Sequence, residues 1–183
     1  MTNRLAELSS KHYENESFEQ TLRHIRETGV GVISVAQDDR SLGWTYSTGL
    51  FDTYGQPEII LTGFPVGLAQ FIVNEVGKHY RDGKPVEVDQ RTAGFIGNDI
   101  DVVFRPVAKV WLHRLMLRTL WYYGDDNFPV LQCICPDFGN HFPWEEGFDP
   151  SWRDRQALLY EDAPRNKAER QLWNVSSAEA SVQ

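Results

Sequence analysis

The sequence predicts an α+β fold in which one mostly antiparallel sheet packs with about three helices. Short apolar runs rich in β-branched residues recur along the chain, as they do in buried strands. Longer segments repeat their apolar residues at helical spacing, which is typical of helices packed by one face. Because these strands and helices do not alternate regularly, we do not expect a doubly wound parallel sheet.

The chain is expected to start with a flexible polar segment, residues 1–16, followed by a helix over residues 18–28. Ser17 followed by Gln20 has the outline of a capping box, in which a hydroxyl and an amide satisfy the first backbone N–H groups. Gly29 is a typical residue to end this helix, because glycine readily adopts the left-handed conformation found there.

Three strands and a long helix are expected next. Residues 30–36 and 58–63 are continuous apolar runs, and residues 43–49 alternate between apolar and polar side chains. Pro65 suits the first turn of a helix over residues 65–82, because a helix leaves the first backbone N–H groups without a partner in any case.

The second half of the chain predicts three more strands, over residues 84–89, 99–106 and 129–135, and a helix over residues 109–123. We expect a single domain over residues 17–160 and a polar C-terminal tail over residues 161–183, since 183 residues suit one domain with short extensions. The residues expected in the core are Ile33, Val35, Ile60, Leu61, Leu68, Ile72, Val103, Leu115, Leu131 and Ile134.

The charge balance excludes several classes of protein. Eighteen Lys and Arg against 26 Asp and Glu give a net charge of −8, whereas a protein that binds nucleic acid needs a basic face. No stretch approaches the roughly 20 apolar residues of a membrane span, and the N-terminus lacks the apolar region of a signal peptide. We therefore expect a cytoplasmic protein with no nucleic-acid and no membrane partner.

Motifs for common chemistries are absent from the sequence. It has no glycine-rich phosphate loop, no nucleophile elbow and no zinc-protease helix, and its five histidines are scattered. We expect no cofactor and no metal, and the pattern identifies no catalytic residue. Cys133 and Cys135 are expected to be small core residues, with a reactive or metal-binding pair as the alternative. Asp99 and Asp101 fit turn chemistry better than a carboxylate pair.

One segment, residues 119–152, holds six acidic and nine aromatic residues and no Lys or Arg. Such a segment suits a basic protein partner or a cationic ligand, and we therefore expect a binding or immunity-type accessory protein rather than an enzyme. The alternative is that the rings complete the core and the acids are solvated. We expect residues 121–152 to form a cleft with residues 44–58. The residues expected to bind there are Tyr46, Glu58, Tyr123, Asp137, His141 and Trp144.

A second hypothesis is a small hydrolase or transferase that uses part of the same cleft. A few polar groups within apolar surroundings are typical of an active site, and Tyr46, Glu58, Asp137 and His141 are its candidates. A small-molecule ligand in this cleft is a third hypothesis. All three place the same two segments side by side.

Two blocks of the sequence resemble a bacterial family known as domain of unknown function 4262. The first is WTYSTGLFDTYGQPEIILTGFP, and the second is YYGDDNFPVLQCICPDFGNHFPWEEGFD. The chain departs from the family pattern at Ser47, at Thr48 and in the Cys-x-Cys of the second block. The resemblance covers about residues 20–150 and implies a bacterial or phage setting, but it implies no activity. The matching positions are Tyr46, Gly49, Leu50, Gly55, Pro57, Glu58, Phe128, Pro129, Gln132, Pro136, Asp137, Phe142, Pro143 and Trp144.

Overall fold

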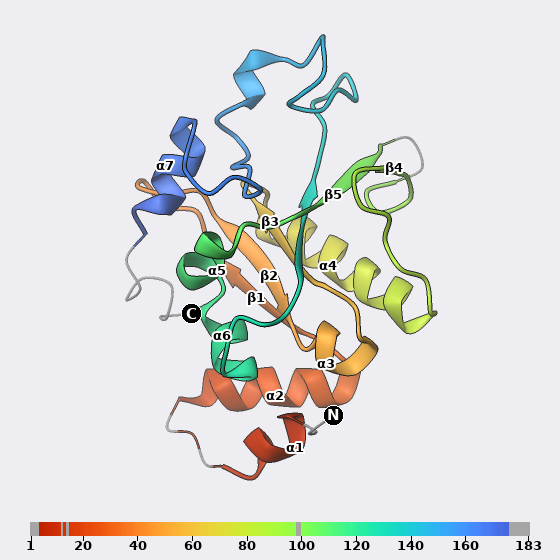
Figure 1. Ribbon diagram of the computed structural model, residues 1–183, viewed down its shortest axis with the longest axis vertical. Coiled ribbons are helices and arrows are strands. Elements are labelled where there is room, and N and C mark those ends of the chain that lie inside the picture. The colour runs from red at the N-terminus through yellow and green to blue at the C-terminus, as the bar shows by residue number, and fades with distance from the viewer. Residues whose placement is uncertain (1–3, 12, 14, 98–99, 176–183) are drawn as a thin grey trace.

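A computed structural model describes residues 4–11, 13, 15–97 and 100–175, and these form a six-stranded sheet with helices on both of its faces (Figure 1). The strand order is β1-β2-β3-β6-β5-β4. Among the described strands, β3 and β6 pair in parallel, and the other four neighbouring pairs are antiparallel. The α+β class is therefore confirmed, and the sheet is mixed rather than purely antiparallel. The strands are β1 Gly31–Val35, β2 Trp44–Thr48, β3 Glu58–Thr62, β4 Arg91–Thr92, β5 Val102–Pro106 and β6 Val130–Ile134.

The helices include shorter elements that the sequence pattern did not predict. The longest helix, α4, covers one face of the sheet, and α5, α6 and α7 cover the other (Figure 1). The helices are α1 Arg4–Ser9, α2 Glu16–Thr28, α3 Leu50–Tyr54, α4 Val66–Arg81, α5 Lys109–Leu115, α6 Leu117–Tyr123, α7 Lys167–Trp173 and the 3-10 turn η1 Pro150–Trp152.

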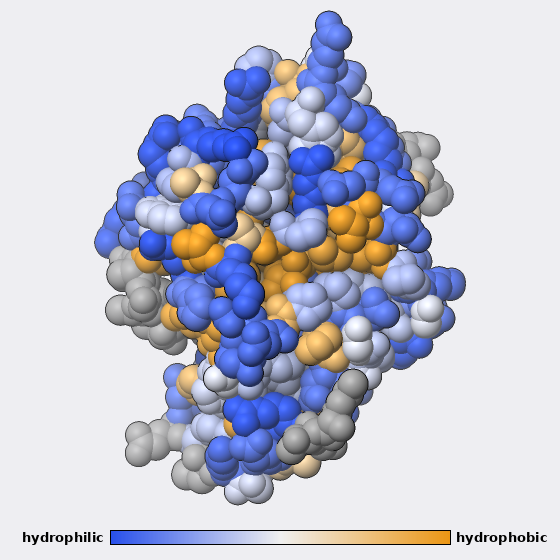
Figure 2. All heavy atoms as spheres, viewed as in Figure 1, coloured by the Kyte–Doolittle hydropathy of each residue, from blue (hydrophilic) through white to orange (hydrophobic). Residues whose placement is uncertain are grey.

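Alternate residues of the central strands supply the two halves of the core. Ile59 and Leu61 point toward α4, whereas Ile60 between them points toward α5 and α6. The predicted core residues are buried except Val35 and Leu68, which are partly exposed at the edge of the packing. The face shown in Figure 2 is largely hydrophilic, with an apolar band across its middle.

The helix predicted over residues 109–123 is wrong in one respect, because it breaks at Met116 into α5 and α6. Two side chains of β2 occupy the backbone groups that a continuous helix would use there. The indole of Trp44 donates to the Leu115 carbonyl at 2.9 Å, and the hydroxyl of Tyr46 accepts from the Arg118 N–H at 3.4 Å. These long-range contacts replace two helical hydrogen bonds, so the break is a consequence of tertiary packing.

The predicted strand over residues 84–89 is also wrong. Asp89 has φ 58°, a left-handed conformation that ends an extended run, and only Val88 forms an isolated bridge, to Phe104. The strand at the outer edge of β5 is β4, which begins two residues after the predicted strand, and β6 pairs with the other edge of β5. The strand predicted over 99–106 begins at Val102, and Asp99 lies outside the described residues.

The capping box predicted at the start of α2 is replaced by a different cap. Asn15 is the N-cap, and its side chain accepts from the Ser17 N–H at 2.9 Å. Gly29 ends the helix in the left-handed conformation, as expected, with φ 86°. The Ser17 hydroxyl accepts instead from the guanidinium of Arg118.

Both terminal segments contain a packed helix, although the sequence predicted a flexible segment over residues 1–16 and a polar tail over residues 161–183. Leu8 of α1 is buried beside Leu22 and Tyr122. In the tail expected over residues 161–183, Leu172 of α7 is fully buried against α5, and residues 176–183 lie outside the described residues. Across the described part of the chain, no helix combines the length and the apolar character needed to cross a membrane.

Candidate functional site

The structure divides the six expected binding residues into two groups at opposite ends of the sheet. In the parallel β3–β6 pair, Glu58 lies beside Val130, at the start of both strands. Asp137 follows the other end of β6, three residues beyond Ile134. The cleft expected between residues 44–58 and 121–152 is therefore not formed as one site, because β6 runs between its two halves.

The first group is centred on Glu58, which is completely buried. Its carboxylate accepts from the Tyr123 hydroxyl at 2.5 Å, from the Gly49 and Phe51 N–H groups at 2.8 and 3.2 Å, and from the Ser47 hydroxyl. One carboxylate thus joins β2, β3, α3 and α6. This is the arrangement of a structural crosslink.

Burial dominates the electrostatics of this group. It raises the pKa of Glu58, although the hydrogen bonds from Ser47 and Tyr123 oppose the change. Burial beside this carboxylate also raises the pKa of Tyr123. Tyr46 points toward α6, and burial raises its pKa to about 12. None of these groups lines a described cavity.

In the second group, Asp137 organises the loop that follows β6. Its carboxylate accepts from the N–H groups of Gly139, His141 and Asp149 at 2.8, 2.9 and 2.7 Å. Backbone hydrogen bonds from Asp149 and His141 lower the pKa of Asp137. The His141 ring lies 3.6 Å from the same carboxylate and is partly exposed. Asp137 therefore acts on the shape of the loop rather than on the charge of a surface.

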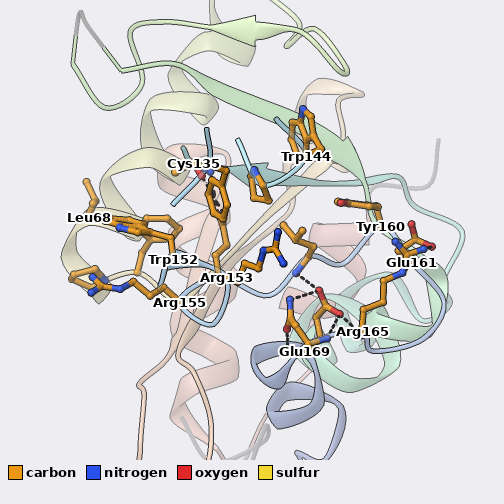
Figure 3. Close-up of a pocket in the computed structure, with 18 residues that line it drawn as sticks. Leu68, Cys135, Trp144, Trp152, Arg153, Arg155, Tyr160, Glu161, Arg165 and Glu169 are labelled. Carbon is orange, nitrogen blue, oxygen red and sulfur yellow. Dashed lines mark hydrogen bonds and ion pairs between the residues drawn. The ribbon is translucent and has the colours of Figure 1, made fainter. Parts of the chain in front are cut away.

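Trp144 is the expected residue that borders a substantial pocket. Its ring stacks on Phe142, with centroids 5.2 Å apart, and the Arg105 guanidinium lies 3.6 Å above it. It is 38% exposed and belongs to the lining of the pocket drawn in Figure 3. This position is compatible with the predicted role of an aromatic anchor.

The pocket has a volume of about 640 Å³ and is formed by the segment after β3, the first turns of α4, the loop after β6 and the start of α7 (Figure 3). Aromatic and arginine side chains dominate its lining. The lining residues are Gly63, Phe64, Pro65, Leu68, Cys135, Pro143, Trp144, Phe148, Trp152, Arg153, Arg155, Gln156, Leu158, Tyr160, Glu161, Arg165, Asn166 and Glu169.

Buried amides hold the far wall of this pocket against the sheet. Gln132 of β6 donates to the Ala157 carbonyl at 2.6 Å and accepts from the Leu159 N–H at 2.8 Å. Gln156 exchanges two hydrogen bonds with the backbone of Cys135. Gly63 allows the close approach, because a Cβ there would lie 1.7 Å from the Arg155 carbonyl oxygen.

The charges that face the pocket are mainly positive. Arg153 and Arg155 are exposed at its edge, and Arg155 lies 4.8 Å above the Trp152 ring. Arg165 forms an ion pair with Glu161 at 2.5 Å. The carboxylate of Glu169 accepts only local N–H groups, those of residues 158, 165 and 166. Two arginines thus have no acidic side chain against them within the described residues.

Several acidic residues of segment 119–152 are engaged with other groups of the protein. Asp126 lies within 3.3 Å of Lys109 and His113, and Glu145 lies 2.6 Å from Arg91. Asp149 caps η1 through the Ser151 N–H. Most of these carboxylates therefore form ion pairs or hydrogen bonds with groups of the protein itself. The charge pattern of the sequence does not reveal these partners.

Sequence reasoning missed the half of the pocket that lies beyond residue 152. Trp152, Arg153 and Arg155 lie within four residues of one another in the sequence. This spacing indicates a surface that is both aromatic and basic. It was missed because the segment adjoins the expected polar tail. Cys135 was expected in the core, and it is buried at the floor of this pocket.

A family model described as Domain of unknown function (DUF4262) matches residues 24–149, more than half of the chain. No curated protein and no solved structure matches the chain. The matched region includes Trp144, whereas Trp152 and the arginines at the edge of the pocket follow it.

Proposed function

Since this chain belongs to the DUF4262 family, whose description states no activity, we propose its function from the pocket itself. The protein binds a small molecule that has a flat apolar part and an anionic group. The observation that carries this proposal is a pocket of about 640 Å³ in which aromatic rings meet Arg153 and Arg155, for which no ion pair with a described residue is found. Pockets for small ligands measure about 300–1,000 Å³ and are lined mainly by apolar and aromatic side chains.

The apolar part of the ligand is assigned to the rings of Phe148 and Trp152 and to the edge of Trp144. Phe142 and Arg105 cover the two faces of the Trp144 ring. Flat side chains favour flat ligands, because stacked rings bury a large area and lose little conformational freedom. Trp144 is already held by Phe142 and Arg105, so ligand binding does not have to order it. A preformed wall of this kind favours affinity.

The anionic part of the ligand is assigned to Arg153 and Arg155. A guanidinium binds carboxylate, sulfonate and phosphate oxygens through two parallel N–H groups. The expected basic protein partner has less support, because the acidic side chains of segment 119–152 have local partners. The hydrolase or transferase alternative also has less support, because Tyr46 and Glu58 are buried away from Asp137 and His141.

Three probes that share one ring system and differ in charge test this proposal. Naphthalene sulfonate, naphthalene methanol and naphthylmethylammonium are titrated by calorimetry into the full chain. We expect the sulfonate to bind more tightly than the alcohol, and the alcohol more tightly than the ammonium. Replacing Arg153 and Arg155 together by Gln should weaken sulfonate binding about tenfold and leave alcohol binding unchanged.

Two controls make this result specific to the pocket. Arg81→Gln removes an exposed arginine at the end of α4, away from the pocket, and should not change the binding of any probe. Trp152→Ala should weaken the sulfonate and the alcohol alike, because it removes part of the aromatic wall. Equal affinity of the three probes for the wild-type protein would contradict the proposal.

A further inference from the structure

Arg118 of α6 is a buried cation whose guanidinium contacts hydroxyl groups and aromatic rings within the described part of the chain. The residue is only 7% exposed, and no acidic side chain lies within ion-pair distance of its guanidinium among the described residues. Burial lowers the pKa of Arg118, because removal from water disfavours the charged form. Buried charges in proteins are normally paired, so this arginine needs an explanation.

The contacts of Arg118 hold the guanidinium but do not neutralise it. One terminal nitrogen donates to the Thr21 hydroxyl at 3.1 Å, and the other donates to the Ser17 hydroxyl at 2.8 Å. The Phe18 ring lies 3.9 Å from the guanidinium carbon. A guanidinium has five N–H groups, and these contacts use two of them, so the planar group keeps donors for a further acceptor.

A small polar cavity lies next to this guanidinium, between α2, β1 and α6. Its volume is about 140 Å³, which is room for roughly four or five waters at about 30 Å³ each. Its described lining includes hydroxyl, amide, imidazole and guanidinium groups, and none of these described residues is acidic, although the chain as a whole carries a net charge of −8. The lining residues are Ser17, Gln20, Thr21, His24, Val32, Ile33, Ser34 and Arg118.

We propose that this cavity binds a small oxyanion, a phosphate, sulfate or carboxylate group, through Arg118. The oxyanion supplies the missing counter-charge and accepts the unused guanidinium N–H groups. Ser17 and Thr21 hold the guanidinium over the Phe18 ring, so its position is fixed before the anion arrives. The site shares no lining residue with the pocket beside Trp144, and it stands independently of the proposed function.

The alternative is that the ring and the two hydroxyls alone explain the buried arginine. Arg114 provides a matched control, because its guanidinium also lies over a ring, 4.0 Å from Trp173, and donates to a backbone carbonyl. Arg114 is not among the residues that line the small cavity. If Arg118 has a purely structural role, its replacement should affect oxyanion binding no more than the replacement of Arg114 does.

Calorimetric titration of the full chain with inorganic phosphate, sulfate and acetate, at an ionic strength held constant with chloride, tests the proposal. We expect saturable binding of at least one of these oxyanions and a higher unfolding temperature in its presence than in chloride. Arg118→Met should weaken that binding at least about tenfold, whereas Arg114→Met should leave it unchanged.

A second variant keeps the test decisive if Arg118→Met does not fold. Thr21→Val keeps the charge and removes one hydroxyl that orients it, so the same oxyanion should bind several-fold more weakly. A wild-type response to all three oxyanions that equals the response to chloride would overturn the proposal. Unchanged oxyanion binding in Arg118→Met, or in Thr21→Val where Arg118→Met does not fold, would also overturn it.

Discussion

Replacing Glu58 by Ala should destabilise the protein by about 4 kcal/mol, because it removes an acceptor that several buried donors share. Gly49 and Phe51 would lose the partner of a backbone N–H, and Tyr123 and Ser47 would lose the partner of a hydroxyl. A buried donor without a partner costs about 1–3 kcal/mol, and some of these four can turn to water or to a neighbour. The expected total is therefore well above that of an ordinary substitution.

Glu58→Gln keeps one oxygen for three of the donors and should cost about half as much. In this variant the new NH2 group faces the Ser47 hydroxyl. That hydroxyl loses the acceptor of its own proton, and it already accepts from the Ile59 N–H at 2.8 Å. Urea unfolding followed by circular dichroism measures both free energies of unfolding. Glu27→Ala, at an exposed position of α2, is the control and should stay within about 0.5 kcal/mol of the wild type. A cost below about 1 kcal/mol for Glu58→Ala would refute this reasoning.

The pH dependence provides an independent check on Glu58. Because burial raises its pKa in the folded state, the folded protein holds this proton more tightly than the unfolded chain does. The stability that protonated Glu58 contributes is complete below the unfolded pKa, near 4.5, and is lost as pH rises through the folded value. The stability of the wild type relative to Glu58→Gln should therefore fall as pH rises above about 4.5. A relative stability that rises over that range would contradict the assignment.

Three further predictions concern the packing and the loops. Leu172→Ala should cost about 2–5 kcal/mol in urea unfolding, because α7 belongs to the core; a change near zero would place α7 in a dispensable tail. Trp44→Phe should cost about 1 kcal/mol, because the Leu115 carbonyl loses its donor at the helix break, and Trp121→Phe controls for the loss of an indole. Since hydrogen bonds lower the pKa of Asp137, the stability it contributes should be lost as pH falls below about 3.8, and Asp137→Asn should remove that part of the acid transition.

Local patterns in the sequence determined the longest helices and most of the strands. The helix α4 and the strands β1, β2, β3 and β6 follow from apolar periodicity and from short β-branched runs, which act over a few residues. The same patterns identified Ile60 and Ile72 as core residues. When the apolar residues of a helix or strand lie on one face, that face must pack against the core. The opposite orientation would expose the apolar side chains to water.

The break between α5 and α6 depends on residues about seventy positions away in the chain. The apolar spacing of residues 109–123 fits one helix, and nothing in that segment signals an end at Met116. The indole of Trp44 and the hydroxyl of Tyr46 decide it by taking two backbone hydrogen bonds. Tertiary contacts of this kind override helix propensity, which differs by only about 1 kcal/mol per residue between most residue types.

The sequence by itself identified Glu58, Asp137 and Trp144, together with Tyr46, Tyr123 and His141, only as candidates for binding. Only the tertiary structure decided what each one does. Glu58 is enclosed as a crosslink, Asp137 shapes a loop, and only Trp144 faces a pocket. The physical reason is that burial and hydrogen bonding depend on partners from distant segments, and a parallel β3–β6 pairing puts the two groups at opposite ends of the sheet.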